Sequence, residues 1–463
     1  MFLDREQELA LLEQCYSSEV AELFVLYGRR RVGKTELLGR FCEGKRYVFY
    51  VADQDAEPRL RAGLSAEVNT RLLGEAAASA VYPTWEALFR LLASHAQHEP
   101  LVVVLDEFTY LLAAHPPLAS ILQRLWDSEL RHTRLKLVLC GSHIGMMESE
   151  VLGYQAPLYG RRTGQALLEP LGFHDARAFC PSYSAEDQVR AFAVFGGTPA
   201  YLTAAQLTAP LVETIQSRVL QRGTFFYDEV RFLLQQELRE PRNYFAVLEA
   251  IAGGRTRQNE IKQATGIDGV SAYLGTLQEL KLVERIVPVT ETQPHKSRRG
   301  IYRLRDPFFR FWLRFVHANR TLLERGGAQV VLETKVVPQL DAFTGPAFEQ
   351  VCEQFVWRLG LSGRLPLVPE RVGGWWGGDA EIDLIALGGD SAMAFECRWS
   401  SRPVGTDILA RLEARTTALA GVGDRAAVWY GLCSRSGFTA GVRAVVRERS
   451  DVRLFDLAAI VAG

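Results

Sequence analysis

The stretch Leu-Phe-Val-Leu-Tyr-Gly-Arg-Arg-Arg-Val-Gly-Lys-Thr, residues 23–35, decides the fold of this chain. Its first five residues are apolar and predict a short buried strand. Residues 28–35 match G-x-x-x-x-G-K-[ST] at every fixed position, and the residues from Glu36 onward predict a helix. This order separates a phosphate-binding loop from a chance match or a simple glycine turn before a helix. The stretch therefore predicts a nucleotide site.

The backbone and the side chains of this loop have separate expected roles. Gly28 and Gly33 allow successive N–H groups to point at phosphate, and the N-terminus of the helix adds its positive end. Lys34 is expected to reach the β- and γ-phosphates of ATP, and the Thr35 hydroxyl to ligate Mg²⁺. The predicted nucleotide-binding residues of the loop are Gly28, Arg29, Arg30, Arg31, Val32, Gly33, Lys34 and Thr35.

A second apolar run, Leu101–Leu105, ends in two carboxylates, Asp106 and Glu107. This pattern is typical of a buried parallel strand whose functional end is exposed. We expect Asp106 to hold Mg²⁺ through water and Glu107 to orient and activate the attacking water. Two acidic residues after an apolar run could also open a loop, but a phosphate loop about 70 residues earlier suits a strand–helix–strand fold.

Three further polar residues are candidates for sensing or stabilising the γ-phosphate. Residues 135–140 predict another strand, and Ser142 at its tip would lie beside the γ-phosphate if this strand neighbours the first one. A turn-forming Gly-Ser pair explains the same residues equally well. Arg161 and Arg162 could supply charge to the transition state, in cis or in trans, or could be a solvated or salt-bridged pair. Residues 164–171 predict the last strand of this part.

The middle of the chain predicts three helices followed by two strands, which is the order of a winged helix. The segment between the two strands carries Lys296, Arg298 and Arg299, which could lie on the phosphates of double-stranded DNA. The third helix is poor in basic residues, so major-groove reading is not favoured. A module that only packs on the nucleotide-binding part is an equally good interpretation. The five elements are expected at residues 243–251, 257–264, 270–282, 283–289 and 300–304.

A predicted hairpin at residues 380–399 carries Asp383 on one strand and Glu396 on the other. The two carboxylates could face one another and bind a divalent cation. A solvated hairpin face is the alternative, which the residue types alone favour. Glu349 or Glu353, on a preceding predicted helix, is expected to approach the pair.

Composition limits the remaining possibilities. A length of 463 residues is enough for roughly three domains. The net charge of −1 means that any nucleic-acid-binding surface must be local. The seven cysteines form no C-x-x-C pair, so neither a zinc site nor a disulfide framework is predicted. No apolar run approaches the ~18 residues of a membrane span, and the N-terminus is not that of a signal peptide. We therefore expect a cytoplasmic protein that does not bind membranes.

Short motifs along almost the whole chain resemble the archaeal-type ATPases, which also occur in bacteria and belong to the STAND branch of AAA+-related P-loop ATPases. Those proteins also carry a winged helix and a C-terminal domain resembling the restriction-endonuclease (PD-(D/E)xK) fold. The motifs are Phe-Leu-Asp-Arg-Glu-x-Glu-Leu at 2–9, Tyr-Gly-Arg-Arg-Arg-Val-Gly-Lys-Thr-Glu-Leu at 27–37, Leu-Asp-Glu-Phe at 105–108, Gly-Ser at 141–142, Leu-Tyr-Gly-Arg-Arg at 158–162 and Phe-Gly-Gly-Thr-Pro at 195–199.

The resemblance implies further roles. Arg5 and Glu6 would lie near the adenine, and Pro199 would approach the nucleotide. Ser142 would be the sensor, and one of the two arginines at 161–162 would supply charge.

The resemblance also matches Asp383 and Glu396 to the metal carboxylates of the nuclease fold. The chain departs from that pattern at Arg398, which replaces the expected lysine of E-x-K. Arginine stays protonated and cannot act as a general base, although it can stabilise negative charge. Cleavage of DNA is therefore in doubt.

We predict an α/β fold: a P-loop ATPase core with a parallel sheet at residues 1–175, a helical lid at 176–240, a winged helix at 241–325 and a restriction-endonuclease-like α/β domain at 326–463. The resemblance implies a slow ATPase, using ATP and Mg²⁺, whose nucleotide state controls domain arrangement. One alternative is an ATP-regulated DNA-binding protein or metal-dependent nuclease. The other is a regulatory module with an inactive nuclease-like domain, which would bind protein partners or further copies of itself.

Overall fold

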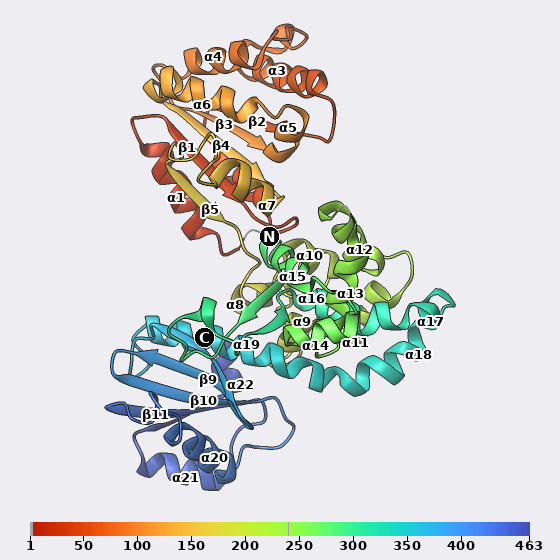
Figure 1. The fold of residues 1–463 in the computed structure, drawn as a ribbon, viewed down its shortest axis with the longest axis vertical. Coiled ribbons are helices and arrows are strands. Elements are labelled where there is room, and N and C mark those ends of the chain that lie inside the picture. The colour runs from red at the N-terminus through yellow and green to blue at the C-terminus, as the bar shows by residue number, and fades with distance from the viewer. Residues whose placement is uncertain (1–2, 239) are drawn as a thin grey trace. The chain divides into compact units, whose positions relative to one another are not determined.

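The computed structural model describes residues 3–238 and 240–463, so Phe2 of the first family motif lies outside the described residues. The chain forms two compact units, the first ending at Pro170 and the second running from Leu171 to Gly463 (Figure 1). Among the described residues, no helix is long and apolar enough to cross a membrane.

The first unit is built on a five-stranded sheet in the order β2-β3-β4-β1-β5, and its paired strands are parallel. β1, β3, β4 and β5 coincide with segments predicted to be strands, although β5 ends at Leu167 rather than Leu171. The two central strands, β3 and β4, are buried along their whole length, as expected for a sheet covered on both faces. The strands are β1 (Glu22–Tyr27), β2 (Tyr47–Val51), β3 (Leu101–Asp106), β4 (Leu135–Gly141) and β5 (Gly164–Leu167).

Helices cover both faces of this sheet because the strand side chains alternate between two apolar clusters. Leu23 and Val25 pack with α3 to α6, whereas Phe24 and Leu26 pack with α1 and α2. Strands with apolar side chains on both faces therefore give a three-layer α/β unit, and the predicted fold class is confirmed. The helices are α1 (Glu6–Ser17), α2 (Lys34–Cys42), α3 (Glu57–Leu73), α4 (Trp85–His95), α5 (Phe108–Ala114), α6 (Leu118–Ser128) and α7 (Ile144–Met146).

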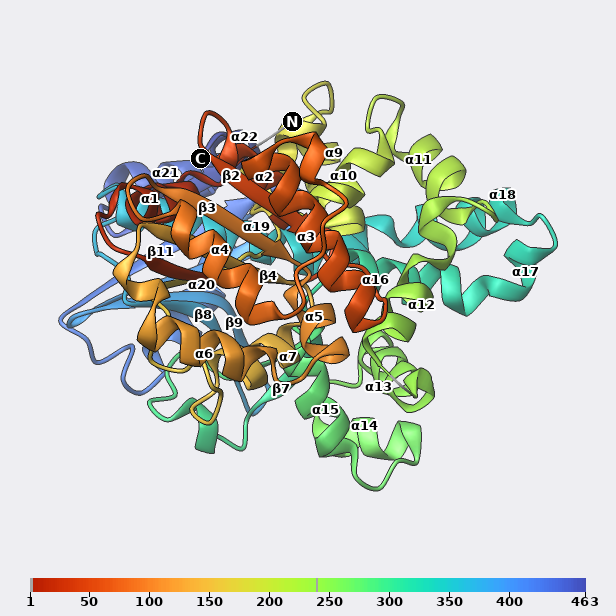
Figure 2. The ribbon, with the colours of Figure 1, turned by 90° about the horizontal axis from the view of Figure 1, so that it is seen from above.

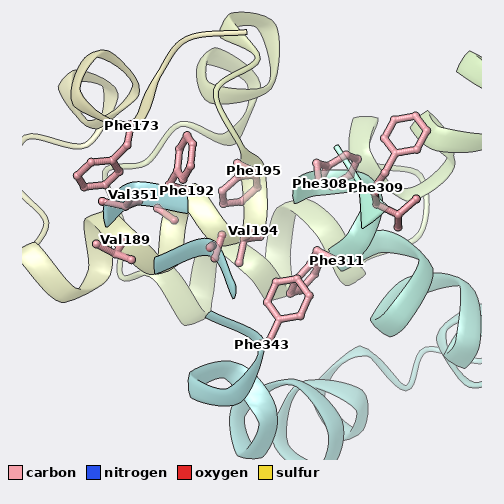
Figure 3. Packing of buried hydrophobic residues seen from close by; sticks show 14 of the residues in the cluster. Phe173, Val189, Phe192, Val194, Phe195, Phe308, Phe309, Phe311, Phe343 and Val351 are labelled. Atoms are coloured by element: carbon pink, nitrogen blue, oxygen red, sulfur yellow. The ribbon is translucent and has the colours of Figure 1, made fainter. Parts of the chain in front are cut away.

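The second unit has one large hydrophobic cluster that extends from Leu171 to Val461. Aromatic side chains from distant segments meet in it, including Phe195, Phe308 and Phe343 (Figure 3). The indole N–H of Trp312 donates to the carbonyl oxygen of Tyr227, at 2.8 Å. The helices around this cluster are α8 (Phe173–Ala176), α9 (Ala185–Phe195), α10 (Pro199–Ala205), α11 (Leu211–Thr214), α12 (Phe225–Glu237), α16 (Pro307–Phe311), α17 (Arg320–Glu324), α18 (Ala328–Val331), α19 (Leu340–Leu361) and α22 (Leu457–Ala462).

Three helices and a strand pair in the middle of the chain follow the order expected of a winged helix. The helices gather together in space, and β6 pairs with β7 in antiparallel fashion (Figure 2). The elements are α13 (Pro241–Ala252), α14 (Gln258–Thr265), α15 (Val270–Glu279), β6 (Val283–Ile286) and β7 (Ile301–Leu304). The winged-helix assignment stays a prediction. So do the boundaries at 175, 240 and 325, since the three segments after Leu171 share one cluster.

The last part of the second unit is a mixed sheet in the order β12-β11-β10-β9-β8. The first three strands, β8 to β10, pair in antiparallel fashion, and β10 to β12 pair in parallel. One face packs on α19 and α22, and the other on α20 and α21. The elements introduced here are β8 (Arg371–Gly377), β9 (Ala380–Gly388), β10 (Ser391–Arg398), β11 (Ala427–Ser434), β12 (Val452–Asp456), α20 (Thr406–Thr417) and α21 (Ala440–Glu448).

Candidate nucleotide-binding site

The phosphate loop lies between β1 and α2, and its two glycines have structural reasons to be glycine. A Cβ on Gly28 would lie 2.3 Å from the carbonyl oxygen of Leu168, which no side chain tolerates. Gly33 has φ +94°, a conformation that favours glycine, and α2 begins at the next residue. The N-terminus of α2 is therefore placed at the end of the loop, where backbone N–H groups can bind phosphate.

Lys34 is folded into the loop. Only 6% of the residue is exposed, and its Nζ donates to the carbonyl oxygens of Gly28 at 2.9 Å and Arg29 at 3.0 Å. Burial lowers the pKa of Lys34, and the nearby carboxylates of Asp106 and Glu107 act against that shift. The ammonium group is thus held under the loop, where a phosphate can replace the backbone carbonyls as its partner.

Thr35 and Asp106 meet at the expected magnesium position. The Thr35 hydroxyl donates to Oδ2 of Asp106 at 2.6 Å, and the other oxygen, Oδ1, accepts from the backbone N–H of Glu107 at 2.9 Å. Thr35 is exposed whereas Asp106 is buried. An exposed hydroxyl beside a fixed carboxylate is an oxygen donor set that fits Mg²⁺, which keeps several waters and uses few protein ligands.

Glu107 and Ser142 are held together across the sheet edge. The Ser142 hydroxyl donates to Oε2 of Glu107 at 2.7 Å, and its backbone N–H donates to the same oxygen at 3.3 Å. This contact follows from strand order, because β4 lies between β3 and β1. Glu107 has φ +52°, so its backbone adopts the left-handed region directly before α5. The candidate base and the candidate sensor therefore lie side by side.

The loop is also bound to the segment that ends the first unit. Arg5 is buried, and its guanidinium donates to the carbonyl oxygens of Val32 at 3.2 Å and Glu169 at 2.8 Å. The backbone N–H of Leu168 donates to the carbonyl oxygen of Tyr27 at 2.7 Å. Arg5 therefore joins the phosphate loop to residues 168–170.

The other predicted nucleotide contacts differ in exposure. Glu6 is exposed at the start of α1, and Val32 is buried among the apolar residues under the loop. Arg29, Arg30 and Arg31 are partly exposed. None of the three residues is without interactions, and the Arg30 guanidinium donates to the Tyr110 hydroxyl at 2.6 Å.

The two candidate charge-supplying arginines are engaged elsewhere. Arg161 makes a two-pronged ion pair with Asp127 of α6, at 2.7 and 2.9 Å. Arg162 donates to the carbonyl oxygen of Leu152 at 3.2 Å. Of the two interpretations open at the sequence level, the salt-bridged one describes Arg161 in this structure. Pro199 is the first residue of α10 in the second unit, and its approach to the nucleotide stays a prediction.

The two candidate carboxylates of the C-terminal sheet lie on the paired strands β9 and β10. Asp383 on β9 accepts from the backbone N–H of Cys397 at 2.7 Å. Burial, followed by the charge of Glu396, raises the pKa of Asp383 to about 7. Burial likewise raises the pKa of Glu349 to about 7, and Glu349 is among the charges that act on Asp383. Burial also raises the pKa of Glu353.

Arg398 is ion-paired with Glu396 through Oε1. The other oxygen, Oε2, is buried with no hydrogen-bond partner and lies 4.0 Å from the guanidinium of Arg415. Both oxygens of Glu396 therefore have an arginine as ion-pair partner, and the cation site stays a prediction.

The basic residues between β6 and β7 do not form one surface. Lys296 and Arg298 are exposed, whereas Arg299 is partly buried. The Arg299 guanidinium donates to the carbonyl oxygen of Trp376 and pairs with Glu291 at 3.3 Å. Arg299 is thus held by contacts within the second unit, although 38% of its side chain is exposed.

Sequence reasoning missed several partners of these residues. The carbonyl oxygens of Leu168 and Glu169 carry no local signal, because their role depends on how β5 returns to β1. The contact of Tyr110 with Arg30 depends instead on how α5 packs beside the phosphate loop. The Glu107–Ser142 hydrogen bond joins the residues that follow two predicted strands, but the pairing of those strands was not predicted.

Comparisons with known proteins agree with this geometry. The family model for ATPase domains predominantly from Archaea matches residues 2–205, and a model for archaeal and bacterial proteins of unknown function matches residues 312–415. An uncharacterised protein of Methanocaldococcus jannaschii is 32% identical over 403 residues, covering 86% of this chain and 88% of that protein. An uncharacterised ATP-binding protein of the same archaeon is 50% identical over 46 residues, which are 10% of this chain and 78% of that protein.

A solved structure shares the fold. The Walker-type ATPase of Pyrococcus abyssi aligns with a TM-score of 0.52 and 20% identity, covering 68% of this chain and 96% of that one. The M. jannaschii protein that is 32% identical matches most of its own length and most of this chain. The family model for the ATPase domain spans the phosphate loop, Asp106 and Glu107. The chain therefore belongs to the family of P-loop ATPases found predominantly in Archaea.

Proposed function

We propose that this ATPase is a nucleotide-dependent switch, in which the occupant of the phosphate loop controls the arrangement of the second unit. The observation that carries the proposal is the attachment of residues 168–170 to the loop. The Leu168 carbonyl lies against Gly28, and Arg5 joins Val32 to Glu169. Any loop movement on nucleotide binding acts directly on the segment that leads into the second unit.

Glu107 supplies the second half of the switch. Its carboxylate is bonded to Ser142, the proposed sensor, at the tip of the strand next to β1. A γ-phosphate that takes over the Ser142 hydroxyl would release Glu107 to bind the attacking water. Binding and hydrolysis would then have separate effects on the sheet edge, as a switch with ATP and ADP states requires.

Small-angle X-ray scattering of the full chain tests the switch. Glu107→Gln with saturating Mg–ATP should give a profile that differs from the Mg–ADP state, and Lys34→Ala should show no nucleotide-dependent change. Arg5→Gln should still bind nucleotide but show a smaller difference, whereas Arg90→Gln on the exposed side of α4 should behave like the parent. Identical profiles with saturating ATP and ADP would refute the switch while leaving the ATPase assignment intact.

DNA is our second candidate, as the partner that the switch controls. The exposed Lys296 and Arg298 support it, because they lie in the segment between β6 and β7 that a winged helix places on phosphates. Binding to a protein partner or to a second copy of the chain is the competing role. Turnover of ATP measured with and without duplex DNA separates these roles, since only a DNA-controlled switch should respond to the duplex.

We further propose that the Asp383–Glu396 pair is an ion-paired remnant with weak or absent cleavage. The pairing of Arg398 with Glu396 supports this, because a guanidinium cannot accept the proton that a general base must take. Plasmid incubated with Mn²⁺ should stay intact with the parent protein and with Asp383→Ala. Cleavage by Arg398→Lys alone would show that the domain is a nuclease scaffold that lacks only the lysine of the E-x-K pattern. Nicking by the parent that Asp383→Ala abolishes would show an active nuclease instead.

A further inference from the structure

Three cysteines that are far apart in the sequence meet inside the second unit. Cys352 lies on α19, Cys397 on β10 and Cys433 on β11. Cys397 and Cys433 are directly opposite one another in the parallel ladder between the two strands. The three Sγ atoms all lie within 4.8 Å of one another, so one helix and two strands contribute to a single sulfur cluster.

The cluster is closed to solvent. Cys352 and Cys433 have no exposed surface, and 6% of Cys397 is exposed. A single buried cysteine is ordinarily a small apolar side chain. Three sulfurs within 4.8 Å of one another are instead a set of soft donors that could share one ion.

We propose that Cys352, Cys397 and Cys433 bind one soft, thiophilic metal ion, and that Cu(I) is the ion that fits. Thiolate ligands select Cu(I), zinc or iron–sulfur clusters. Structural zinc sites and iron–sulfur clusters take four protein ligands, and catalytic zinc keeps an open position for water. Within residues 3–238 and 240–463, the group contains three cysteines and no histidine or carboxylate as a fourth member. A closed, three-sulfur site therefore favours an ion that is satisfied by three soft ligands.

The distances suit this assignment. A metal–sulfur bond of about 2.3 Å places the sulfurs of a planar three-coordinate site about 4 Å apart. The Sγ atoms, which lie within 4.8 Å of one another, therefore need to approach by less than about 1 Å. Rotation of the cysteine side chains can supply this movement.

Binding would have a structural consequence. The ion would join α19 to the sheet beside the Asp383 carboxylate, which accepts from the backbone N–H of Cys397. Occupancy would thus stiffen the part of β10 that also carries Glu396 and Arg398.

The test uses the reduced full chain under anaerobic conditions, titrated with Cu(I) against a chromophoric Cu(I) chelator. The parent should bind one Cu(I) per chain, and the bound form should melt at a higher temperature. Cys352→Ala, Cys397→Ala and Cys433→Ala should each lose at least about tenfold in affinity, which corresponds to the loss of about 1.4 kcal/mol. Cys180→Ala, at a buried position outside the cluster, is the matched control and should bind like the parent. Circular dichroism and nucleotide binding establish that each variant is folded.

A measurement on the unaltered chain makes the test independent of the variants. The thiols of the cluster are buried, so alkylation requires local opening of the chain. Peptide mapping over time should show that Cu(I) slows the labelling of Cys352, Cys397 and Cys433 and leaves that of Cys42 and Cys180 unchanged. Failure to bind Cu(I), protection of other cysteines, or displacement of Cu(I) by equimolar Zn(II) would each overturn the proposal.

Discussion

Lys34 and Glu107 divide nucleotide binding from hydrolysis, because one lies under the phosphate loop and the other at the tip of β3. Lys34→Ala should weaken ATP binding about 10–100-fold, the effect of losing a charge-assisted contact. Glu107→Gln should keep binding and lower turnover about 10²–10⁴-fold through loss of the general base. Glu36→Gln, an exposed residue of α2, is the control. Calorimetric binding and phosphate release measure both effects, and parental turnover by Glu107→Gln would remove the general-base assignment.

His174 makes the second unit sensitive to acid. Burial, with help from the charges of Arg358 and Arg177, lowers the pKa of His174 to about 4, compared with about 6.5 in an unfolded chain. Between these values the unfolded state binds the extra proton, so the free energy of unfolding falls as the pH decreases from 7 toward 4. After allowance for partial exposure, the loss by pH 5 is about 1 kcal/mol.

Replacing this histidine tests the pH dependence. His174→Gln should reduce the decrease in stability between pH 7 and pH 5 by about 1 kcal/mol, measured by urea unfolding at both values. His98→Gln, an exposed position in the first unit, should leave the decrease unchanged. An equal decrease in both variants would assign the acid sensitivity to other groups.

At the scale of elements, the segment between β6 and β7 carries two exposed basic side chains, Lys296 and Arg298, and a third, Arg299, that is held by other residues of the second unit. Lys296→Ala with Arg298→Ala should weaken DNA binding and make the slope of log affinity against log salt less steep by about 2, because about two fewer counterions are released. Lys335→Ala, an exposed position in the same unit, should change neither quantity. Fluorescence anisotropy over a range of salt concentrations measures the slope, and an unchanged slope would contradict phosphate contact by this segment.

Arg299 should behave differently from its two neighbours. Its guanidinium bonds the carbonyl oxygen of Trp376 on β8 and pairs with Glu291. Arg299→Ala should therefore lower the stability of the second unit by about 1–3 kcal/mol, the range for hydrogen bonds to charged groups. Thermal unfolding measures this change. A variant with the stability of the parent but weaker DNA binding would show instead that Arg299 contacts DNA.

At the scale of the whole molecule, the two units have separate apolar clusters and should unfold in two transitions. ATP with Mg²⁺ at 100 times its dissociation constant should stabilise the first unit by about 2.7 kcal/mol and raise its midpoint by about 5–10 °C. The second transition should move less, and Lys34→Ala should abolish the shift of the first. Differential scanning calorimetry is the measurement, and a single transition would show that the two units unfold together.

Local patterns predicted the phosphate loop, Asp106 and Glu107, because a strand, its terminal residues and the following helix are continuous in the sequence. Contacts between distant segments could not be predicted in this way. Two such contacts are the hydrogen bond from Arg299 to the carbonyl oxygen of Trp376 and the proximity of Cys352 to Cys433. Both depend on how separate elements pack. Sequence spacing also could not show that Arg161 is paired with Asp127, since either partner alone is an ordinary surface charge.

The continuous apolar cluster of the second unit has a consequence for synthesis on the ribosome. The first unit can close its core once residues up to Pro170 have emerged. The second cannot, because Leu171 shares its cluster with Ile460 and Val461 of α22. At 5–20 residues per second, roughly 290 residues take about 15–60 s to translate. During that interval a nascent chain exposes aromatic segments such as Phe308–Phe315, which makes it a client for chaperones that shield apolar surface.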